Sequence, residues 1–459
     1  MIKKCICLVF VLAMIAVAVC GCGFDFEKED LSKYITLCDY ENISFDDVKK
    51  AYDDYRKELA EYYSSGTFTV EDGYTLDFKV TAEIVTEEKD GEGNVTATTL
   101  TRYEPLCHDT DEDYVKDYNF GQFEDNSPFD TGLEYLVDEV TGDGLKERVT
   151  RIGESFSFTN VIPKNDPDVE VAGKKVKYTV TIVKILPGIS DDEIYDMIAA
   201  FFQSVGYSKE TAEAGDWVTL DYTAKENGEK IDGSSVTGKE IKLGSGSLPA
   251  EAESALIGHE VGDKVSVTAT FDADFGSSAF AGKTVELSIE VKDIYNADYT
   301  VKNNTDFDTA WEMKEAMKAL YYGQQTFVDI VTAKSEVISY PEELMTKYEK
   351  YYKEYYYSNS HTDEYKEVAE EEVKRTLVAY SLKKAYDIDY TSDDYKEDLT
   401  NLRLYYYYYY NQTVTDAEIE NMYTKSMLKD QFVLQKVTLV LAGKVKFAGQ
   451  PDILPSTAK

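Results

Sequence analysis

Hydrophobic and polar residues alternate one by one in several segments between residues 75 and 295. The apolar positions of two such segments are Tyr178, Val180 and Ile182 in one and Leu287, Ile289 and Val291 in the other. Because successive side chains of a strand point to opposite faces, this period of two predicts strands with one buried face. From Thr309 to Lys446 the period changes to that of amphipathic helices, so we expect a helical C-terminal part.

The strand-rich part contains an internal repeat. Thr-Leu-Asp-Phe at 75–78 recurs as Thr-Leu-Asp-Tyr at 219–222, and Ala-Gly-Lys-Lys-Val at 172–176 recurs as Ala-Gly-Lys-Thr-Val at 281–285. The two motifs start 97 residues apart in the first copy and 62 in the second, so the first contains an insertion, which we place between Val85 and Tyr118. A predicted helix precedes each copy, with Ser and Asp residues near 43–47 and 189–193 as candidate N-caps.

The N-terminus has the pattern of a secretion signal. Lys3 and Lys4 precede an apolar run at 6–19, which is too short to span a membrane comfortably. The run ends before Cys20-Gly21-Cys22, which resembles the lipid-attachment box of bacterial lipoproteins. The resemblance implies a diacylated Cys22, which has enough acyl chains for stable anchoring; an ordinary cleaved signal peptide is the alternative.

The chain is strongly acidic, with 87 Asp and Glu against 48 Lys and Arg among 459 residues, a net charge of −39. Nucleic acid is therefore not an expected partner, and neither is a broad electrostatic contact with anionic lipid. We expect contact with the membrane through the lipid anchor only, on its extracytoplasmic face. Cys38 and Cys107 are the cysteines that follow the signal, and they could form one disulfide in that compartment.

No cofactor or metal is expected. Asp109, Asp111 and Asp113 have the spacing that opens a calcium loop, but Tyr114 and Phe120 stand where Gly and Glu are needed. The three His residues show no ligand spacing, and neither a phosphate-binding Gly loop nor a Ser/His/Asp set is recognisable. Hydrolase and nucleotide-dependent functions therefore have no support.

The second copy contains five motifs in order, beginning with Gly-Asp-Trp-Val-Thr-Leu-Asp-Tyr at 215–222 and ending with the Ala-Gly-Lys-Thr-Val strand. This order resembles the FKBP-type prolyl isomerase domain, and more closely its form within trigger factors. The likeness continues at 333–341, which is similar to the opening of an arm of the trigger-factor chaperone domain, and in the order of helices at 368–447. The ribosome-docking signature Gly-Phe-Arg-x-Gly-Lys is not found, so no ribosome contact is expected.

The resemblance implies an α+β fold class, with two tandem FKBP-like antiparallel β domains, each with a short helix, before an all-α domain. The domains expected are a lipoprotein signal at 1–22, a degenerate FKBP-like domain at 23–186, an FKBP-type isomerase domain at 187–298, a helical chaperone domain at 299–447 and a flexible tail at 448–459.

Prolyl isomerisation needs no proton transfer or covalent step, but a dry, mostly aromatic pocket that favours the twisted amide. The resemblance places catalytic positions at Tyr222, Ile231, Asp232, Phe275 and Leu287, and substrate-binding positions at Leu248, Pro249, Ala252 and Phe271. Ala252 falls where the family has the aromatic floor of the pocket. We therefore expect a weak isomerase, or one whose floor another side chain fills; plain core packing is the alternative role of each aromatic.

Two further features bear on binding. In the first copy, Phe78, Phe129 and Tyr178 fall at corresponding positions, but the Ile-Asp-Gly motif has no counterpart, so we expect a binding surface there. Of the 38 Tyr, 21 lie between Tyr321 and Tyr423, including an unbroken run at 405–410. Six consecutive residues encircle a helix, so some of these rings must face solvent or a partner; filling gaps between helices is the alternative.

These features favour a lipid-anchored, extracytoplasmic folding factor that isomerises X–Pro bonds and binds unfolded or proline-containing exported polypeptides. A holdase that uses both copies only for binding is the alternative. A structural or adhesive surface protein that uses the same folds as spacers is a third hypothesis.

Overall fold

The computed structural model describes residues 24–64, 66–69, 75–91, 94–103, 115–119, 149–162, 170–189, 192–206, 209–271, 280–355, 364–451 and 453. The chain divides into two compact units. One combines the chain up to residue 54 with 319–450, and the other contains 55–318 and the residues after 450. The predicted signal with Cys22, and also Cys107, Phe129 and Phe275, lies outside the described residues.

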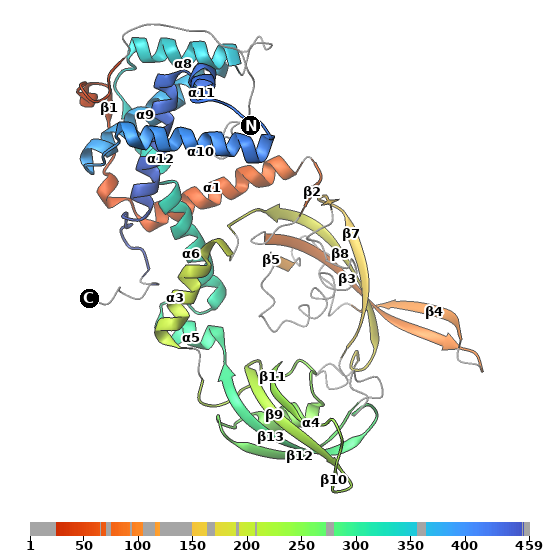
Figure 1. The fold of residues 1–459 in the computed structure, drawn as a ribbon. Helices are drawn as coiled ribbons and strands as arrows, with labels where there is room; N and C mark the ends of the chain where they lie inside the picture. Colours follow the sequence, from red (N-terminus) through yellow and green to blue (C-terminus); the bar gives the residue numbers. More distant parts are fainter. Residues whose placement is uncertain are drawn as a thin grey trace. The chain divides into compact units, whose positions relative to one another are not determined.

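A five-stranded antiparallel sheet forms the second copy of the repeat (Figure 1). Its strands are β9 (Trp217–Glu226), β10 (Glu229–Lys230), β11 (Val236–Lys242), β12 (Lys264–Thr270) and β13 (Thr284–Tyr295). The order is β10-β9-β13-β12, and β11 also pairs with β9. The short helix α4 (Ala250–Leu256) contributes buried residues to the same core as the sheet.

The first copy forms a second antiparallel sheet with β3 (Thr75–Lys89), β4 (Val95–Arg102), β5 (Val115–Asn119), β7 (Ser155–Val161) and β8 (Lys175–Leu186). The order is β4-β3-β8-β7, with β5 also paired to β3. The repeated Thr-Leu-Asp motifs thus lie in β3 of one sheet and β9 of the other. The Ala-Gly-Lys motifs lead into β8 and β13, the strands that pair with β3 and with β9, respectively. A separate small pair joins β2 (Phe68–Thr69) to β6 (Val149–Thr150).

The alternation of apolar residues is confirmed as one-sided burial. Tyr178, Val180 and Ile182 are buried on β8, and Leu287, Ile289 and Val291 are buried on β13. In β13 the intervening residues are exposed or half-buried, so the strand has one face in the core and one toward solvent.

The sheet-containing unit also contains α3 (Tyr195–Val205), α5 (Ala297–Asn304), the second part of α1 (Phe45–Tyr63) and most of α6 (Ala310–Gln325). A 3-10 turn at Asp192–Ile194 precedes α3, and the N-cap of α3 is Ile194, which has no side-chain cap. The helical segment thus begins with this 3-10 turn, and the Ser190 and Asp191 that the sequence offered as caps lie outside the described residues.

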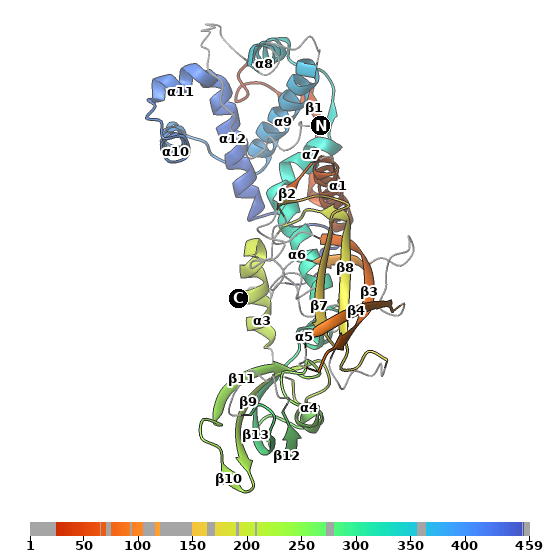
Figure 2. The same ribbon diagram turned by 90° about the vertical axis from the view of Figure 1, so that its right-hand side faces the viewer.

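The other unit is helical, as the sequence period predicted for 309–446. Its elements are α7 (Phe327–Lys334), α8 (Glu342–Tyr355), α9 (Glu364–Ala385), α10 (Ser392–Tyr410), α11 (Asp416–Tyr423) and α12 (Lys425–Ala442), joined by the first part of α1 (Phe45–Tyr63) (Figure 2). The strand β1 (Ile35–Thr36) pairs with β14 (Glu336–Val337). The Ser44 hydroxyl accepts the N–H of Asp47, so the predicted cap of α1 is confirmed.

Among the described residues, none of the helices combines the length and the apolar composition that crossing a membrane requires.

Candidate functional site

Five of the predicted site residues lie in one hydrophobic core within the second sheet and its helix. This core contains Tyr222, Leu248, Ala252, Phe271 and Leu287, all of them buried. Ile231 is half-buried and packs against the same core. The ordered motifs thus converge in space, from two strands, one helix and two loops.

The strand register shows that the two predicted pocket residues on strands share one face of the sheet. Tyr222 on β9 lies opposite Ile289 on β13, and Leu287 lies opposite Ala224. Tyr222 and Leu287 therefore face the same side of the sheet, two positions apart along the paired strands. Burial raises the pKa of the Tyr222 phenol, so the hydroxyl stays protonated and can donate a hydrogen bond.

Sequence reasoning missed Phe280, a buried aromatic of this core. Its ring stacks on Phe271 with centroids 4.8 Å apart, and it lies 6.2 Å from the Tyr222 ring. Phe280 directly precedes the Ala-Gly-Lys motif that both copies contain. Its place next to that motif is the sequence signal that could have identified it. Among the described residues, Tyr222, Phe271 and Phe280 are thus the aromatic members of this core.

Two predicted positions stand apart from the core. Asp232 is exposed in a turn, and Pro249 is half-buried at the N-terminus of α4. The turn is fixed by the buried Ser234, whose hydroxyl donates to the Ala224 carbonyl at 3.1 Å. Phe275 belongs to the segment 272–279, outside the described residues, so its role stays a prediction.

Ala252 is completely buried on α4. Its side chain ends at Cβ, so the helix itself supplies no ring at the predicted floor. Among the described residues, the aromatic groups of this core come instead from β9 and from residues 271 and 280. A proline ring held here would contact fewer aromatic atoms than in a pocket with an aromatic floor, and aromatic contact area dominates such binding.

The residue after Ala252 fixes the loop that leads into α4. Glu253 is buried, and one of its carboxylate oxygens accepts the N–H of Leu248 at 2.8 Å. The other oxygen accepts the N–H groups of Gly244 at 2.8 Å and Gly246 at 3.3 Å. Burial raises the pKa of Glu253, and these N–H donors oppose that shift by stabilising the carboxylate. The carboxylate thus fixes the backbone of the loop that carries Leu248 into the core.

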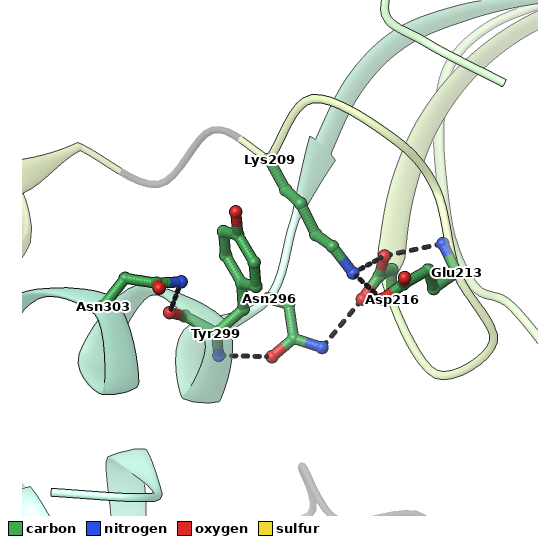
Figure 3. Close-up of polar contacts among 6 residues, drawn as sticks. All are labelled: Lys209, Glu213, Asp216, Asn296, Tyr299 and Asn303. Atoms are coloured by element: carbon green, nitrogen blue, oxygen red, sulfur yellow. Dashed lines mark hydrogen bonds and ion pairs between the residues drawn. The ribbon is translucent and has the colours of Figure 1, made fainter. Parts of the chain in front are cut away.

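A buried ion pair and its hydrogen bonds join the segment before β9 to the segment after β13 (Figure 3). The Nζ of Lys209, in the segment before β9, donates to Asp216 at 2.7 Å and to Glu213 at 2.6 Å. Asn296, just after β13, donates from Nδ2 to the other oxygen of Asp216 at 2.7 Å. Its own carbonyl oxygen accepts the N–H of Tyr299 and caps α5. Burial lowers the pKa of Lys209, but the carboxylates outweigh it and raise the pKa overall.

The described residues contain no group of three or more His, Cys, Asp or Glu side chains arranged to hold a metal ion. The core combines aromatic and aliphatic side chains with a phenol donor, the residue types that line sites for apolar rings.

Comparison with known proteins agrees with this architecture. Residues 208–292 match the family model of FKBP-type peptidyl-prolyl cis-trans isomerases. The chain is 28% identical over 182 residues to the trigger factor of Rhizobium johnstonii, in an alignment that covers 39% of this chain and 36% of that protein. It thus spans little more than a third of that relative.

Longer alignments exist at lower identity. The trigger factor of Ligilactobacillus salivarius is 24% identical over 61% of this chain and 72% of its own length. That of Streptococcus mutans is 22% identical over 68% of this chain and 81% of its own length. A solved structure of the trigger factor chaperone aligns over 68% of this chain and 85% of its own with a TM-score of 0.21 and 16% identity. The chain therefore contains an FKBP-type domain and is a homologue of trigger factors.

Proposed function

We propose that the protein is a lipid-anchored, extracytoplasmic folding factor that isomerises X–Pro bonds in exported polypeptides and binds their unfolded segments. The observation that carries the proposal is the aromatic core of residues 208–292. Tyr222, Phe271 and Phe280 lie together there, within the segment that matches FKBP-type isomerases. The reaction needs a dry aromatic surface and a few oriented polar groups, and it needs no nucleophile.

The isomerase site is assigned to Tyr222, Ile231, Asp232, Phe275 and Leu287, with Leu248, Pro249, Ala252 and Phe271 against the substrate. Glu253 supports this assignment because it holds the loop before α4 in one conformation, so little ordering is required when substrate binds. Since Ala252 provides no aromatic floor, the enzyme is expected to be weaker than one with a complete aromatic pocket.

The first sheet is proposed to be a degenerate FKBP-like copy. Its support is the shared strand order, with β3 and β8 paired as β9 and β13 are, together with the repeated motifs. The copy does not have the Ile-Asp-Gly motif, so its proposed role is binding. The two copies and the helical part then form the domain series 23–186, 187–298 and 299–447.

The proposed location rests on the sequence 1–22 and on net charge. The signal pattern and Cys22 support attachment at the outer face of the membrane, away from ribosomes. Metabolic labelling with a radioactive fatty acid tests this. Labelled protein is expected from the natural chain and none from Cys22→Ser; equal labelling of both would exclude Cys22 as the attachment site.

The isomerase activity is tested with a short peptide that contains an X-Pro-Phe sequence and the full chain in mild detergent. Catalysis is expected from the natural protein and from Phe78→Ala, which alters the corresponding position of the first copy. Tyr222→Ala is expected to lose it. Catalysis lost only in Phe78→Ala would move the site to the first copy, and no catalysis at all, even with an unfolded protein substrate, would exclude an isomerase.

A second candidate function is a holdase without isomerase activity. The observation that favours it is the exposed tyrosine surface at the end of α10, together with the absence of a ring at Ala252. A holdase suppresses aggregation of an unfolded protein but leaves the rate of prolyl isomerisation unchanged. Measurement of both activities on the same preparation separates the two functions, and absence of both would favour a structural surface protein.

A further inference from the structure

The insertion in the first copy builds a long hairpin. β3 continues to Lys89 and returns as β4, and the two strands project together from their sheet (Figure 1). Asp90 closes the turn, because its N–H donates to the Asn94 carbonyl at 2.9 Å and its carboxylate accepts the Asn94 N–H at 2.9 Å. The hairpin is therefore an ordered element in which β4 has a fixed register on β3.

β4 is the edge strand of its sheet. The strand order is β4-β3-β8-β7, so among the described strands β4 pairs with β3 alone. All eight of its residues are exposed. A strand in this position presents N–H and C=O groups that can pair with another extended chain.

The register identifies which groups point outward. The Tyr103 N–H donates to the Ala82 carbonyl at 2.9 Å, which makes these two residues a hydrogen-bonded pair. Hydrogen-bonded and non-hydrogen-bonded pairs alternate along an antiparallel ladder. Thr98, opposite Glu87, and Leu100, opposite Val85, are therefore non-hydrogen-bonded positions. Their backbone N–H and C=O groups point away from β3, to the free edge.

The composition of β4 does not protect this edge. The strand reads Val-Thr-Ala-Thr-Thr-Leu-Thr-Arg, rich in strand-forming residues, without proline and with a charge only at its last residue. Native proteins usually block an edge strand with lysine, proline or a bulge, because an open edge recruits other chains. The single register shift of this hairpin lies between Glu88 and Lys89, next to the turn, and leaves the middle of β4 regular.

The net charge of the protein indicates which kind of chain can pair with β4. Residues 83–102 contain five acidic and two basic side chains, and the whole chain has a net charge of −39. A second copy of this protein would bring two strongly acidic molecules together. A neutral or basic extended segment meets no such repulsion, and main-chain pairing requires no particular sequence.

We propose that β4 binds an extended, neutral or basic segment of an unfolded polypeptide by accepting it as an additional strand. This inference names the client class and a docking site for the proposed folding factor, and so it rests on that function. The binding is main-chain pairing at Thr98 and Leu100, separate from the aromatic core of residues 208–292.

The test uses the full chain and a fluorescent peptide of alternating valine and threonine with a lysine at each end. Binding is followed by fluorescence anisotropy. In the variant Thr98→Pro/Leu100→Pro the outward N–H groups are removed, whereas pairing with β3 remains possible because proline is tolerated where the N–H faces solvent. The matched control, Thr98→Val/Leu100→Val, keeps the N–H groups and the tendency to form strands. A second control peptide has its alternate amides N-methylated.

The peptide is expected to bind the natural chain and the valine control equally, and to bind the proline variant at least about tenfold more weakly. The N-methylated peptide is expected not to bind. Equal binding to the proline variant, or binding of the N-methylated peptide, would overturn the proposal. Sedimentation that shows a dimer lost in the proline variant would overturn it in favour of a second copy. The isomerase assay is independent, so its failure is distinguishable from failure of this site.

Discussion

The Nζ of Lys209 lies 2.7 Å from a carboxylate oxygen of Asp216, and both side chains are buried, with 7% and 1% of their surfaces exposed. Asp216 also accepts the backbone N–H of Glu213 and a hydrogen bond from Asn296. One carboxylate therefore joins the segment before β9 to the segment after β13. Because Asn296 also caps α5, the same cluster sets where that helix begins.

Asp216→Ala is expected to destabilise the protein by about 3–5 kcal/mol, because it removes the buried carboxylate partner of the Lys209 ammonium and leaves only the exposed Glu213 beside it. Urea unfolding followed by tryptophan fluorescence measures the change, since Trp217 lies next to Asp216 in the chain. Glu213→Ala is the control, since the Glu213 side chain is 71% exposed and should cost at most about 1 kcal/mol. Equal effects of the two substitutions would show that the buried pair has no special role.

Glu253→Gln is expected to weaken the loop before α4. A carboxamide has one oxygen, so an NH₂ group would face N–H donors of Gly244 and Gly246 or of Leu248. The loss of stability should be about 1–3 kcal/mol, as for a buried donor left without an acceptor. The isomerase activity should fall as well, because the loop that Glu253 fixes carries Leu248, a predicted substrate-binding residue, into the core.

Thermal unfolding and the peptide assay together test this. Glu251→Gln, an exposed position in the same helix, is the matched control and should change neither quantity. If the activity of Glu253→Gln stays at the natural level while stability drops, the carboxylate stabilises the fold without positioning the site.

Phe280→Ala is expected to destabilise the second sheet domain by about 3–5 kcal/mol, the usual cost of removing a buried ring. The ring stacks on Phe271 and lies beside Tyr222, so its loss should also reduce catalysis. Phe280→Leu keeps most of the volume and should be milder in both respects. Calorimetry and the peptide assay measure the two effects; full activity in Phe280→Ala would show that Phe280 belongs to the core alone.

The sequence predicted the strands of the core well, because burial of one face leaves a period of two. Tyr178, Val180 and Ile182 could be assigned to one face without any structure, and so could the equivalent residues of β13. The tyrosine run 405–410 also follows its expectation, which was that six consecutive residues on a helix cannot all be buried. Tyr406 is buried, whereas Tyr407–Tyr410 are exposed.

Long-range relationships could not be predicted in this way. Nothing local indicates that β1, near residue 35, pairs with β14, near residue 337, so that the N-terminal segment joins the helical unit. Glu253 is similar: an acidic residue in a short helix normally faces solvent, and only the fold of the preceding loop explains its burial. The residue Phe280 was missed because no motif contained it.

The pKa of Asp394 predicts a pH dependence in the helical unit. The Thr391 hydroxyl and N–H donate to its carboxylate, and Lys436 lies 3.2 Å from it, so the pKa falls from 3.8 to about 2. A lowered pKa in the folded state means that the contribution of this carboxylate to stability is complete above about pH 4 and is lost as the pH falls through 2.

The measurement is an NMR titration of the Asp394 carboxyl carbon. Thr391→Ala should raise the pKa of Asp394 toward the ordinary value, so that the helical unit loses this stabilisation at a higher pH. Thr391→Ser keeps the hydroxyl and should resemble the natural protein. An unchanged titration in Thr391→Ala would mean that Lys436 and the backbone N–H of residue 391, which alanine keeps, set the pKa without the hydroxyl.

The end of α10 provides the last prediction. Tyr407, Tyr408 and Tyr409 are 54%, 73% and 76% exposed, and the rings of Tyr407 and Tyr408 meet edge to face with centroids 5.2 Å apart. Such rings offer large amphipathic contact area with little loss of entropy on binding. The triple substitution of these tyrosines by serine should therefore leave stability nearly unchanged, because the side chains are not buried, yet weaken suppression of client aggregation.

Light scattering of an unfolded, basic client protein measures this suppression, and circular dichroism monitors the fold. Tyr195→Ser provides the control, since Tyr195 on α3 is 64% exposed but lies outside the run. A similar loss in the control would indicate a general effect of surface tyrosine. Full suppression by the triple variant would mean that clients bind elsewhere, and the open edge of β4 is the site that the structure offers, because it holds a chain by its backbone and needs no aromatic contact.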